Sequence, residues 1–444
     1  MTSIWVTVAV TDRAAALGAL MRDLEAQTHE AGVRLVVLVV ENSASPEKRA
    51  ANWRTVDWLR SRGADVTLLD GGPYRRPICQ SRERQRRWVA DQLTRRPRPA
   101  FVWMLDDDNR LDHLVEADGV LGVRRLEHHV QRLLDLAKDP GRPDLLIGRV
   151  CGDPPIPPAA TLASRLTDLE VNLEALLALP SAPAVTTLAH LPLAHDFDAY
   201  YDFSHEREDP SWSSPRRWLA ADPEATGREE LERLLSEASC LGQGVALTRP
   251  LVAVSERLED LASGYRRGGN AVFFEPMACL DHEYPAVELY GLTSRRGDMI
   301  GSALLSRHYR VRTSGFTVRH ARPRTPVFPT KEALVSSIAS DTWGAALARG
   351  VVGDGPQSIR EFLLHRSDRI EQAMEVAVTK ARRIRPLVER AVGQGPRTVL
   401  DVIDWVVSEA PVGSEGTELL AAPAVIEALT RKADELESRW RRVA

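Results

Sequence analysis

The chain has 444 residues, of which 43% are hydrophobic and 27% are charged, so its composition is that of an ordinary folded globular protein and does not favour disorder. Its formal net charge of -4 gives no overall attraction to nucleic acid or to an anionic membrane, so nucleic acid is not supported as a partner. The four cysteines lie far apart without zinc spacing, which argues against a disulfide framework and against structural zinc.

The start of the chain and its apolar runs bear on the cellular compartment. The N-terminal sequence MTSIWVTVAVTDR alternates and lacks a basic leader region, so it predicts a strand and not a signal peptide. No apolar run approaches the length of a membrane-spanning helix. With the cysteines read as reduced core thiols, these features predict a cytoplasmic protein without a transmembrane segment.

The first 110 residues alternate between apolar runs and helical patterns. Strands are predicted at residues 4–10, 35–40, 66–69 and 101–105, and an arginine-rich helix at 80–93. The six consecutive aliphatic residues of 35–40 are typical of a strand buried on both faces. Strands that alternate with helices predict a parallel sheet with right-handed crossovers. Ligands of such sheets bind beyond the carboxyl ends of the strands.

The pattern changes after a further predicted strand at residues 145–147. A Pro-rich segment at 154–158 and a helix at 166–179 indicate an insertion. Strands are expected again in the middle of the chain, and a helical pattern begins at about residue 331. The later predicted strands are residues 244–247, 271–274, 309–313 and 316–320.

The fourth apolar run is followed directly by three adjacent carboxylates, Asp106, Asp107 and Asp108. Adjacent carboxylates repel one another, and a divalent cation is the simplest compensation. Mn²⁺ or Mg²⁺ suits oxygen ligands and also bridges phosphates. The alternative is a solvated acidic turn or a helix start, where carboxylates are favoured without a metal. The buried-type strand before the triplet favours the metal.

This strand with its triplet resembles the DXD motif of family 2 glycosyltransferases of the GT-A fold. Asp106 and Asp108 correspond to the DXD pair, and the turn at 9–13 resembles the first-strand turn that approaches the nucleotide. The segment 39–45 resembles the second-strand end that meets the base or ribose, and Arg82 lies in the place of the family's A-R-N motif. The resemblance implies that the nucleotide-sugar is bound by Thr11, Asp12, Arg13, Glu41, Asn42, Arg82, Asp106 and Asp107.

A second match lies at residues 295–320. The family often has an E-D pair at a helix start and then a strand that ends in His; here Gly297 stands in the place of the Glu. The resemblance implies that Asp298 is the catalytic base of an inverting transfer and that His320 joins Asp106 and Asp108 as a metal ligand. The alternatives are a first-turn helix charge for Asp298 and a packed strand-end histidine for His320.

Other polar and aromatic groups are weaker candidates. Six arginines precede the metal motif, and one or two of them are candidates for pairing with a diphosphate: Arg75, Arg76, Arg82, Arg84, Arg86 and Arg87. Gly71 and Gly72 allow either a close backbone approach to a ligand or a simple turn. Residues 281–283 resemble a metal site, but on one strand their side chains would face opposite sides. Tyr200, Tyr201 and Trp212 either stack on a sugar or base or serve as packing.

Taken together, the motifs predict an α/β GT-A fold, with a Rossmann-like, mainly parallel sheet flanked by helices and an α-helical C-terminal region. The predicted parts are 1–150, the nucleotide-sugar-binding half; 151–235, an insertion with candidate acceptor-site elements; 236–330, the acceptor and catalytic half; and 331–444, a helical region and candidate homo-oligomer surface.

The expected function is that of a hexosyltransferase-like glycosyltransferase with a UDP-sugar as the favoured donor and an unidentified acceptor. A nucleotidyltransferase uses a similar sheet and metal, but it usually has a Gly-rich loop near the first strand, which residues 11–13 lack. A non-catalytic nucleotide-sugar-binding or scaffold protein is the other alternative, which Gly297 leaves open and the acidic triplet disfavours. The chain has neither the GxGxxG nor the GxxxxGK[ST] motif, which disfavours dehydrogenases and P-loop ATPases.

Overall fold

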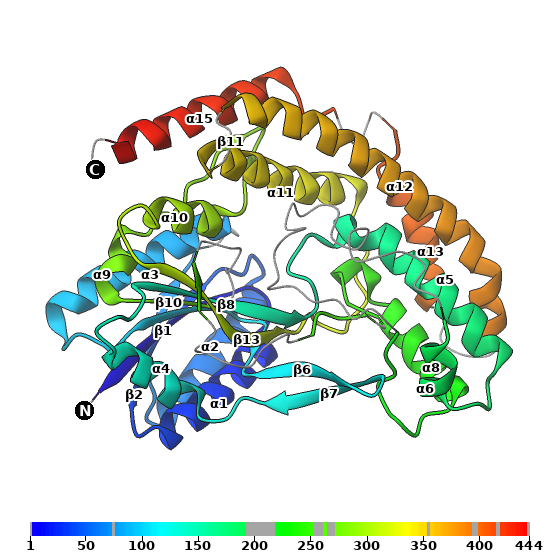
Figure 1. The fold of residues 1–444 in the computed structure, drawn as a ribbon, viewed down its shortest axis with the longest axis horizontal. Coiled ribbons are helices and arrows are strands. Elements are labelled where there is room, and N and C mark those ends of the chain that lie inside the picture. Colours follow the sequence, from blue (N-terminus) through cyan, green and yellow to red (C-terminus); the bar gives the residue numbers. More distant parts are fainter. Residues whose placement is uncertain are drawn as a thin grey trace.

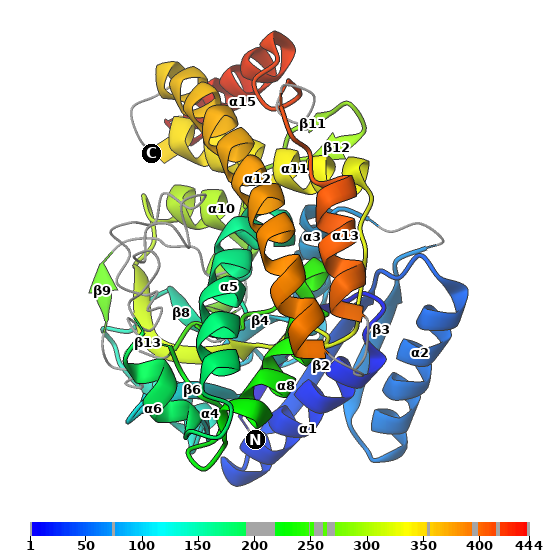
Figure 2. The ribbon, with the colours of Figure 1, turned by 90° about the vertical axis from the view of Figure 1, so that its right-hand side faces the viewer.

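A computed structural model gives the fold of the chain (Figures 1 and 2). It describes residues 2–72, 76–191, 218–247, 249–252, 261–263, 271–352, 356–392, 398–413 and 418–441. Arg75, Tyr200, Tyr201 and Trp212, which the sequence singled out, lie outside the described residues.

The N-terminal half forms a parallel sheet, as the sequence predicts. The strands lie in the order β3-β2-β1-β4, and each neighbouring pair is parallel. Three helices connect them, and the second begins with Pro46 after the side-chain cap Ser45. The bounds are β1 (Ser3–Val10), α1 (Ala14–Glu30), β2 (Arg34–Glu41), α2 (Pro46–Ser61), β3 (Asp65–Asp70), α3 (Ile78–Arg95) and β4 (Val102–Asp106).

The sheet continues beyond β4 with β10 (Val272–Phe274), which is antiparallel to both β4 and β8 (Leu145–Gly152). Next to β8 lies β13 (Val311–His320), which is parallel to it and also pairs with β5 (Asn109–Arg110) and β9 (Ala262–Ser263). The sheet is therefore mainly parallel, as expected. The two strands predicted at 309–313 and 316–320 are one strand whose register shifts between Thr313 and Thr317.

The predicted strand at residues 244–247 is wrong. Val245, Ala246 and Leu247 are buried, but they form a loop whose Ala246 N–H donates to the carboxylate of Asp153 at 2.6 Å. The Asp153 carboxylate thus accepts a hydrogen bond from a backbone N–H that would otherwise bond to a neighbouring strand. The apolar residues at 245–247 therefore indicate burial in the core, and not hydrogen bonding to a neighbouring strand.

The C-terminal helices and the insertion pack into one hydrophobic cluster. Leu166 and Leu173 of α5 (Leu162–Ala178) belong to the same cluster as Trp343 of α11 (Lys331–Val352) and Met374 of α12 (Pro356–Val392). Figure 1 and Figure 2 both show α12 running alongside α5. The segments predicted as 151–235 and 331–444 therefore share a core, although they are far apart in the sequence. The domain boundaries themselves and the homo-oligomer surface stay predictions.

Further helices and strands lie in the described part of the chain. Within the described residues, no helix combines the length and the apolar character needed to cross a membrane. The remaining bounds are β6 (Asp112–Ala117), β7 (Val120–Arg125), α4 (His129–Lys138), α6 (Ala184–Ala189), α8 (Gly227–Ala238), α9 (Pro276–Asp281), β11 (Glu288–Leu289), β12 (Leu292–Thr293), α10 (Gly297–Leu305), α13 (Thr398–Glu409) and α15 (Pro423–Arg441), with 3₁₀ turns at Pro158–Thr161 and Leu241–Gln243.

Candidate functional site

A cavity of about 700 Å³ lies at the carboxyl ends of β1, β4 and β13. Its wall is rich in charge and in hydroxyl groups. The acidic and imidazole lining residues are Asp106, Asp107, Asp108 and His320; the basic ones are Arg13, Arg76, Arg295 and Arg322; and the hydroxyl-bearing ones are Thr11, Thr293, Ser294, Ser336, Ser337 and Ser340. The last three belong to α11, so the C-terminal region forms part of this wall.

Strand pairing brings His320 to the aspartate triplet. His320 ends β13, opposite Asn109, and the next N–H, that of Ala321, donates to the carbonyl of Asp108 at 2.9 Å. The Nε2 atom of His320 lies 3.1 Å from Asp108 Oδ2, and its Nδ1 lies 2.7 Å from the carbonyl oxygen of Asp153. Donation of Nδ1–H to a carbonyl is common in metal-binding histidines, but here Nε2 faces the Asp108 carboxylate, so Nε2 would have to exchange that contact for a metal ion in order to bind one.

Asp108 is buried, and its two carboxylate oxygens differ. Oδ2 faces His320 and also accepts a hydrogen bond from Arg13. Oδ1 is buried with no hydrogen-bond partner among the described residues. Burial opposes ionisation, but the charges of His320 and Arg13 outweigh it and hold the pKa of Asp108 well below its usual range. The site therefore contains an ionised carboxylate with one unsatisfied oxygen.

The two neighbouring carboxylates are held by different partners. Asp107 Oδ2 accepts the Thr11 N–H at 2.9 Å, and burial together with the charge of Asp108 raises the pKa of Asp107 to about 8. Asp106 Oδ1 accepts from Arg82 Nη2 at 2.5 Å, while burial raises its pKa and Arg82 opposes that rise. Three adjacent carboxylates thus avoid the full cost of mutual repulsion, because each lies near a guanidinium group and the pKa values of Asp106 and Asp107 are raised.

The first-strand turn meets the triplet directly. Arg13 contacts both Asp107 and Asp108, and Thr11 lines the cavity beside them. Asp12 is exposed, has a positive φ of 56°, and donates its N–H to Ser43 Oγ at 2.8 Å. Asp12 does not line the cavity. The turn therefore presents Thr11 and Arg13, and not Asp12, to a ligand.

The end of β2 is fixed by hydrogen bonds of its own. Asn42 lines the cavity, and its side chain both donates to the Arg76 carbonyl at 2.9 Å and accepts the Arg76 N–H at 2.8 Å. Glu41 is fully buried; its oxygens accept from the Ser43 N–H and from Asn52 Nδ2. In this structure Glu41 orders the loop and does not line the cavity, so its predicted contact with ribose stays a prediction.

Gly71 lies so close to the backbone at the end of β2 that no larger residue fits there. A Cβ at this position would lie 1.9 Å from the carbonyl oxygen of Glu41. Gly71 therefore lets the segment before α3 pack on the end of β2, and the close approach that the sequence allowed is to the protein's own backbone.

Asp298 lies in the first turn of α10, as its pattern predicts, and it is half-buried. It does not line the cavity, but its charge adds to the rise in the pKa of Asp106, after burial and the charge of Asp108. The buried His282 lies close to it; burial lowers the pKa of His282 to about 4. Residues 281–283 are not on a strand, since Asp281 ends α9 and His282 caps it.

Arg322 and Arg295 line the cavity but are not among the candidate site residues that the sequence motifs indicate. Arg322 donates to the carbonyls of Gln243 at 2.7 Å and Ile156 at 2.7 Å, and burial lowers its pKa to about 10. Arg295 is exposed at the cavity wall. Their only signal was that each lies within three residues of a motif residue, Asp298 or His320.

The metal-binding capacity of the cavity depends on how its carboxylates are already engaged. Within the described ranges, no group of three or more His, Cys, Asp or Glu side chains is arranged to hold a metal ion. Arg13 instead contacts two of the carboxylates. Mg²⁺ in nucleotide sites is usually held by only one or two carboxylates, with substrate phosphates and waters as the other ligands. The unpartnered Oδ1 of Asp108 is one carboxylate oxygen of the kind that such a site would use.

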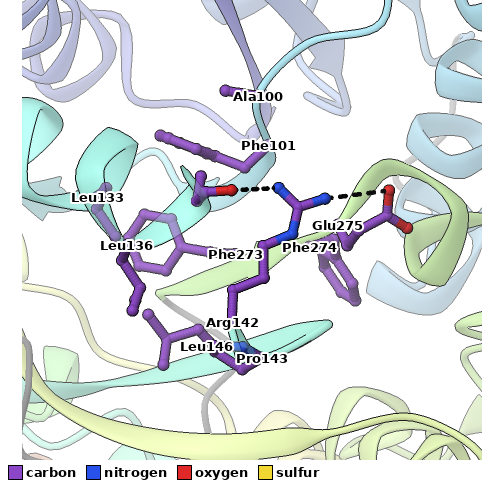
Figure 3. A pocket seen from close by; sticks show the side chains of 11 residues that line it. Ala100, Phe101, Leu133, Leu136, Arg142, Pro143, Leu146, Phe273, Phe274 and Glu275 are labelled. Atoms are coloured by element: carbon purple, nitrogen blue, oxygen red, sulfur yellow. Dashed lines mark hydrogen bonds and ion pairs between the residues drawn. The ribbon is translucent and has the colours of Figure 1, made fainter. Parts of the chain in front are cut away.

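A second, apolar pocket lies at the other end of β4 (Figure 3). It holds only about 30 Å³, and Figure 3 shows Arg142 directed across it toward Glu275, at 4.0 Å. Phe101 of this pocket and Asp106 are five residues apart along the strand, or about 16 Å. The pocket contains no carboxylate cluster, so the aspartate cavity is the candidate site.

Comparison with known proteins gives weak likeness only. No family model matches the chain, and no curated protein matches it. Among solved structures, a mannosyltransferase, PcManGT from Pyrobaculum calidifontis in complex with GDP-Man and Mn²⁺, is 13% identical with a TM-score of 0.32; the match covers 97% of this chain and 86% of that one. The galactosyltransferase LgtC in complex with donor and acceptor sugar analogs is 18% identical with a TM-score of 0.21, covering 33% and 46%. At these values the likeness carries no argument about donor, metal or acceptor.

Proposed function

We propose that the chain is a metal-dependent glycosyltransferase that moves a sugar from a nucleotide-diphosphate donor to an acceptor hydroxyl. One observation carries the proposal. An ionised, buried Asp108 with an unpartnered oxygen lies at the carboxyl end of β4, in the wall of a cavity large enough for a nucleotide-sugar. The resemblance of Asp106 and Asp108 to the DXD motif supports the same chemistry.

Donor binding is assigned to the N-terminal side of the cavity. Thr11, Arg13 and Asn42 line it at the ends of β1 and β2, where nucleotides bind in sheets of this kind. Arg295 and Arg322 lie on the same wall and carry the charge that a diphosphate requires. A UDP-sugar is the favoured donor, on the resemblance of the first-strand and second-strand turns.

Asp106, Asp108 and His320 would hold Mn²⁺ or Mg²⁺, which would stabilise the negative charge that grows on the leaving diphosphate. Arg13 donates to Oδ2 of Asp108 and would have to release that oxygen, or share it, if a cation binds both oxygens of the carboxylate. Arg82 stays paired with Asp106 and orients that carboxylate. Asp107, whose pKa is raised, stays on the Thr11 N–H.

Proton removal from the acceptor hydroxyl is assigned to Asp298, which makes the reaction inverting. An inverting transfer needs one base and no covalent sugar–enzyme intermediate. Support comes from the position of Asp298 at the start of α10, near enough to Asp106 to influence its pKa. The three serines of α11 face the same cavity and are candidate hydroxyl-binding groups for the acceptor.

Thermal unfolding with and without ligands tests the proposal. UDP, GDP and their sugars are each added with Mn²⁺ or with a chelator, to the wild type and to Asp108→Asn. We expect a nucleotide diphosphate to raise the unfolding midpoint only with Mn²⁺, and the variant to lose that response. No stabilisation by any nucleotide would refute the proposed function. Stabilisation without sugar transfer in an acceptor screen by mass spectrometry would indicate a non-catalytic nucleotide-sugar-binding protein.

A further inference from the structure

A third cavity, of about 480 Å³, lies between α3 and α15, apart from the aspartate cavity and from the apolar pocket of Figure 3. Residues of α3, the loop at 283–285 and the C-terminal helix α15 form its wall, together with Arg76. Arg76 also lines the aspartate cavity, so the two cavities are neighbours. No step of the proposed transfer uses this α3–α15 cavity.

The wall of the α3–α15 cavity carries an excess of positive charge. Its acidic residues are Glu83 and Glu283, and its basic residues are Arg76, Arg84, Arg86, Arg87, Lys432 and Arg439. Six basic and two acidic side chains leave a formal excess of four positive charges. The whole chain is negative, with a net charge of -4, so this excess is local.

The two carboxylates are already used by other basic groups in the wall. Glu83 accepts from Arg86 at 2.8 Å and from Arg87 at 3.1 Å, and Glu283 accepts from Arg439. Lys432 pairs with Glu435 at 3.0 Å. Among the described residues, Arg76 and Arg84 form no direct ion pair in this wall, although the charge of Asp70 partly offsets that of Arg84.

Among the described residues, the guanidinium groups of Arg76 and Arg84 donate to backbone carbonyl oxygens. Arg84 Nη2 donates to the Asp70 carbonyl at 2.8 Å, and Arg76 Nε donates to the Gly71 carbonyl at 2.5 Å. Arg84 Nη1 is buried and has no hydrogen-bond partner in the described part of the chain. Burial, followed by the charge of Arg76, lowers the pKa of Arg84, so the two guanidinium groups repel one another. An unsatisfied buried donor beside a like charge is costly unless an anion satisfies both.

We propose that the α3–α15 cavity is a second anion site that binds a phosphate ester through Arg84 and Arg76, with Arg439 of α15 closing it. Guanidinium forks match phosphate oxygens in geometry and charge. The volume lies in the range of small-molecule pockets, so it admits a group larger than a lone ion. This inference is independent of the proposed transfer. The phosphate belongs either to a free small molecule or to a lipid headgroup.

Anion binding to the full chain tests this site. The full chain is titrated calorimetrically with inorganic pyrophosphate in EDTA, so that metal-dependent binding in the aspartate cavity does not contribute to the measured heat. Arg84→Gln removes the unsatisfied donor, Arg439→Gln removes the closing charge from α15, and Arg54→Gln on the exposed face of α2 is the matched control. We expect the wild type, Arg54→Gln and Asp108→Asn to bind equally, and Arg84→Gln to bind about tenfold more weakly or worse.

Vesicle co-sedimentation distinguishes the two sources of phosphate. Vesicles of phosphatidylcholine with phosphatidic acid are compared with phosphatidylcholine alone. Binding that depends on phosphatidic acid and is lost in Arg84→Gln supports a lipid phosphate, and pyrophosphate binding without vesicle binding supports a free phosphate ester. The proposal is overturned if the wild type binds neither. It is also overturned if Arg84→Gln and Arg439→Gln bind as the wild type does. If Arg84→Gln does not fold, Arg439→Gln alone decides.

Discussion

The packing of Gly71 on the end of β2 allows a sharp test of how the candidate site is built. The perturbation is Gly71→Ala, the smallest substitution that adds a Cβ. That atom would lie 1.9 Å from the Glu41 carbonyl oxygen and 3.0 Å from the Glu41 carbonyl carbon. Both neighbours are backbone atoms, so no side-chain rotation relieves the overlap.

The size of the effect follows from the contact. A carbon and an oxygen that are not bonded need about 3.3 Å or more, so the two backbone segments must separate by more than an ångström. Overpacking of this kind costs about 1–3 kcal/mol. The displaced segment carries Asn42, whose two hydrogen bonds to Arg76 border the cavity, so nucleotide affinity should fall as well.

Gly18→Ala is the matched control, because it makes the same change in the interior of α1. The nearest atom to its added Cβ is Thr55 Cγ2 at 3.6 Å, an ordinary van der Waals contact. Replacing a helical glycine by alanine should stabilise the protein by up to about 1 kcal/mol. Urea unfolding of both variants measures the two effects. Equal stability of Gly71→Ala and the wild type would refute the backbone packing described here.

Three further predictions concern the site and its surroundings. Asp298→Asn should keep metal-dependent donor binding and abolish transfer, measured by calorimetry and by mass spectrometry of the product; retained transfer would place the base elsewhere. Arg82→Gln should weaken donor binding at least about threefold, because Asp106 loses its guanidinium partner, and an unchanged titration curve would contradict this. His282 is neutral in the fold at neutral pH, since burial lowers its pKa from 6.5 to about 4. Its contribution to stability is therefore present above pH 6.5 and is lost as the pH falls toward 4, by about 3 kcal/mol. His282→Gln should flatten the urea-unfolding free energy over that range relative to the wild type, and an equally steep fall in both proteins would rule this out.

The parallel half of the sheet could be predicted because its signals are local. The run 35–40 is continuously aliphatic, and β2 is buried on both faces, so composition and structure agree. Asp106, Asp107 and Asp108 follow a strand of the same kind, and the parallel order then places them at the sheet edge where ligands bind. Periodicity and the position of a strand end were sufficient for these residues.

The rest of the site depends on contacts that no local pattern encodes. His320 reaches Asp108 only because β13 lies beside β8 and also pairs with the two-residue β5, which is too short to show a period. Arg322 is held by carbonyls from two other segments. The α3–α15 cavity requires the last helix of the chain to pack back near α3. Residues 244–247 show the reverse error, because burial alone produced a strand-like pattern.

Binding of Mn²⁺, followed by electron paramagnetic resonance, shows directly whether the aspartate cavity holds a metal ion, because the signal of free Mn²⁺ disappears when the ion is bound. We expect weak binding by the wild type alone, since Arg13 contacts Asp108, and tight binding once UDP or another nucleotide diphosphate is added. Asp108→Asn should remove the nucleotide-dependent part, whereas the Arg54→Gln control should keep it. Free Mn²⁺ that is unaffected by the wild type with every nucleotide diphosphate would contradict the account.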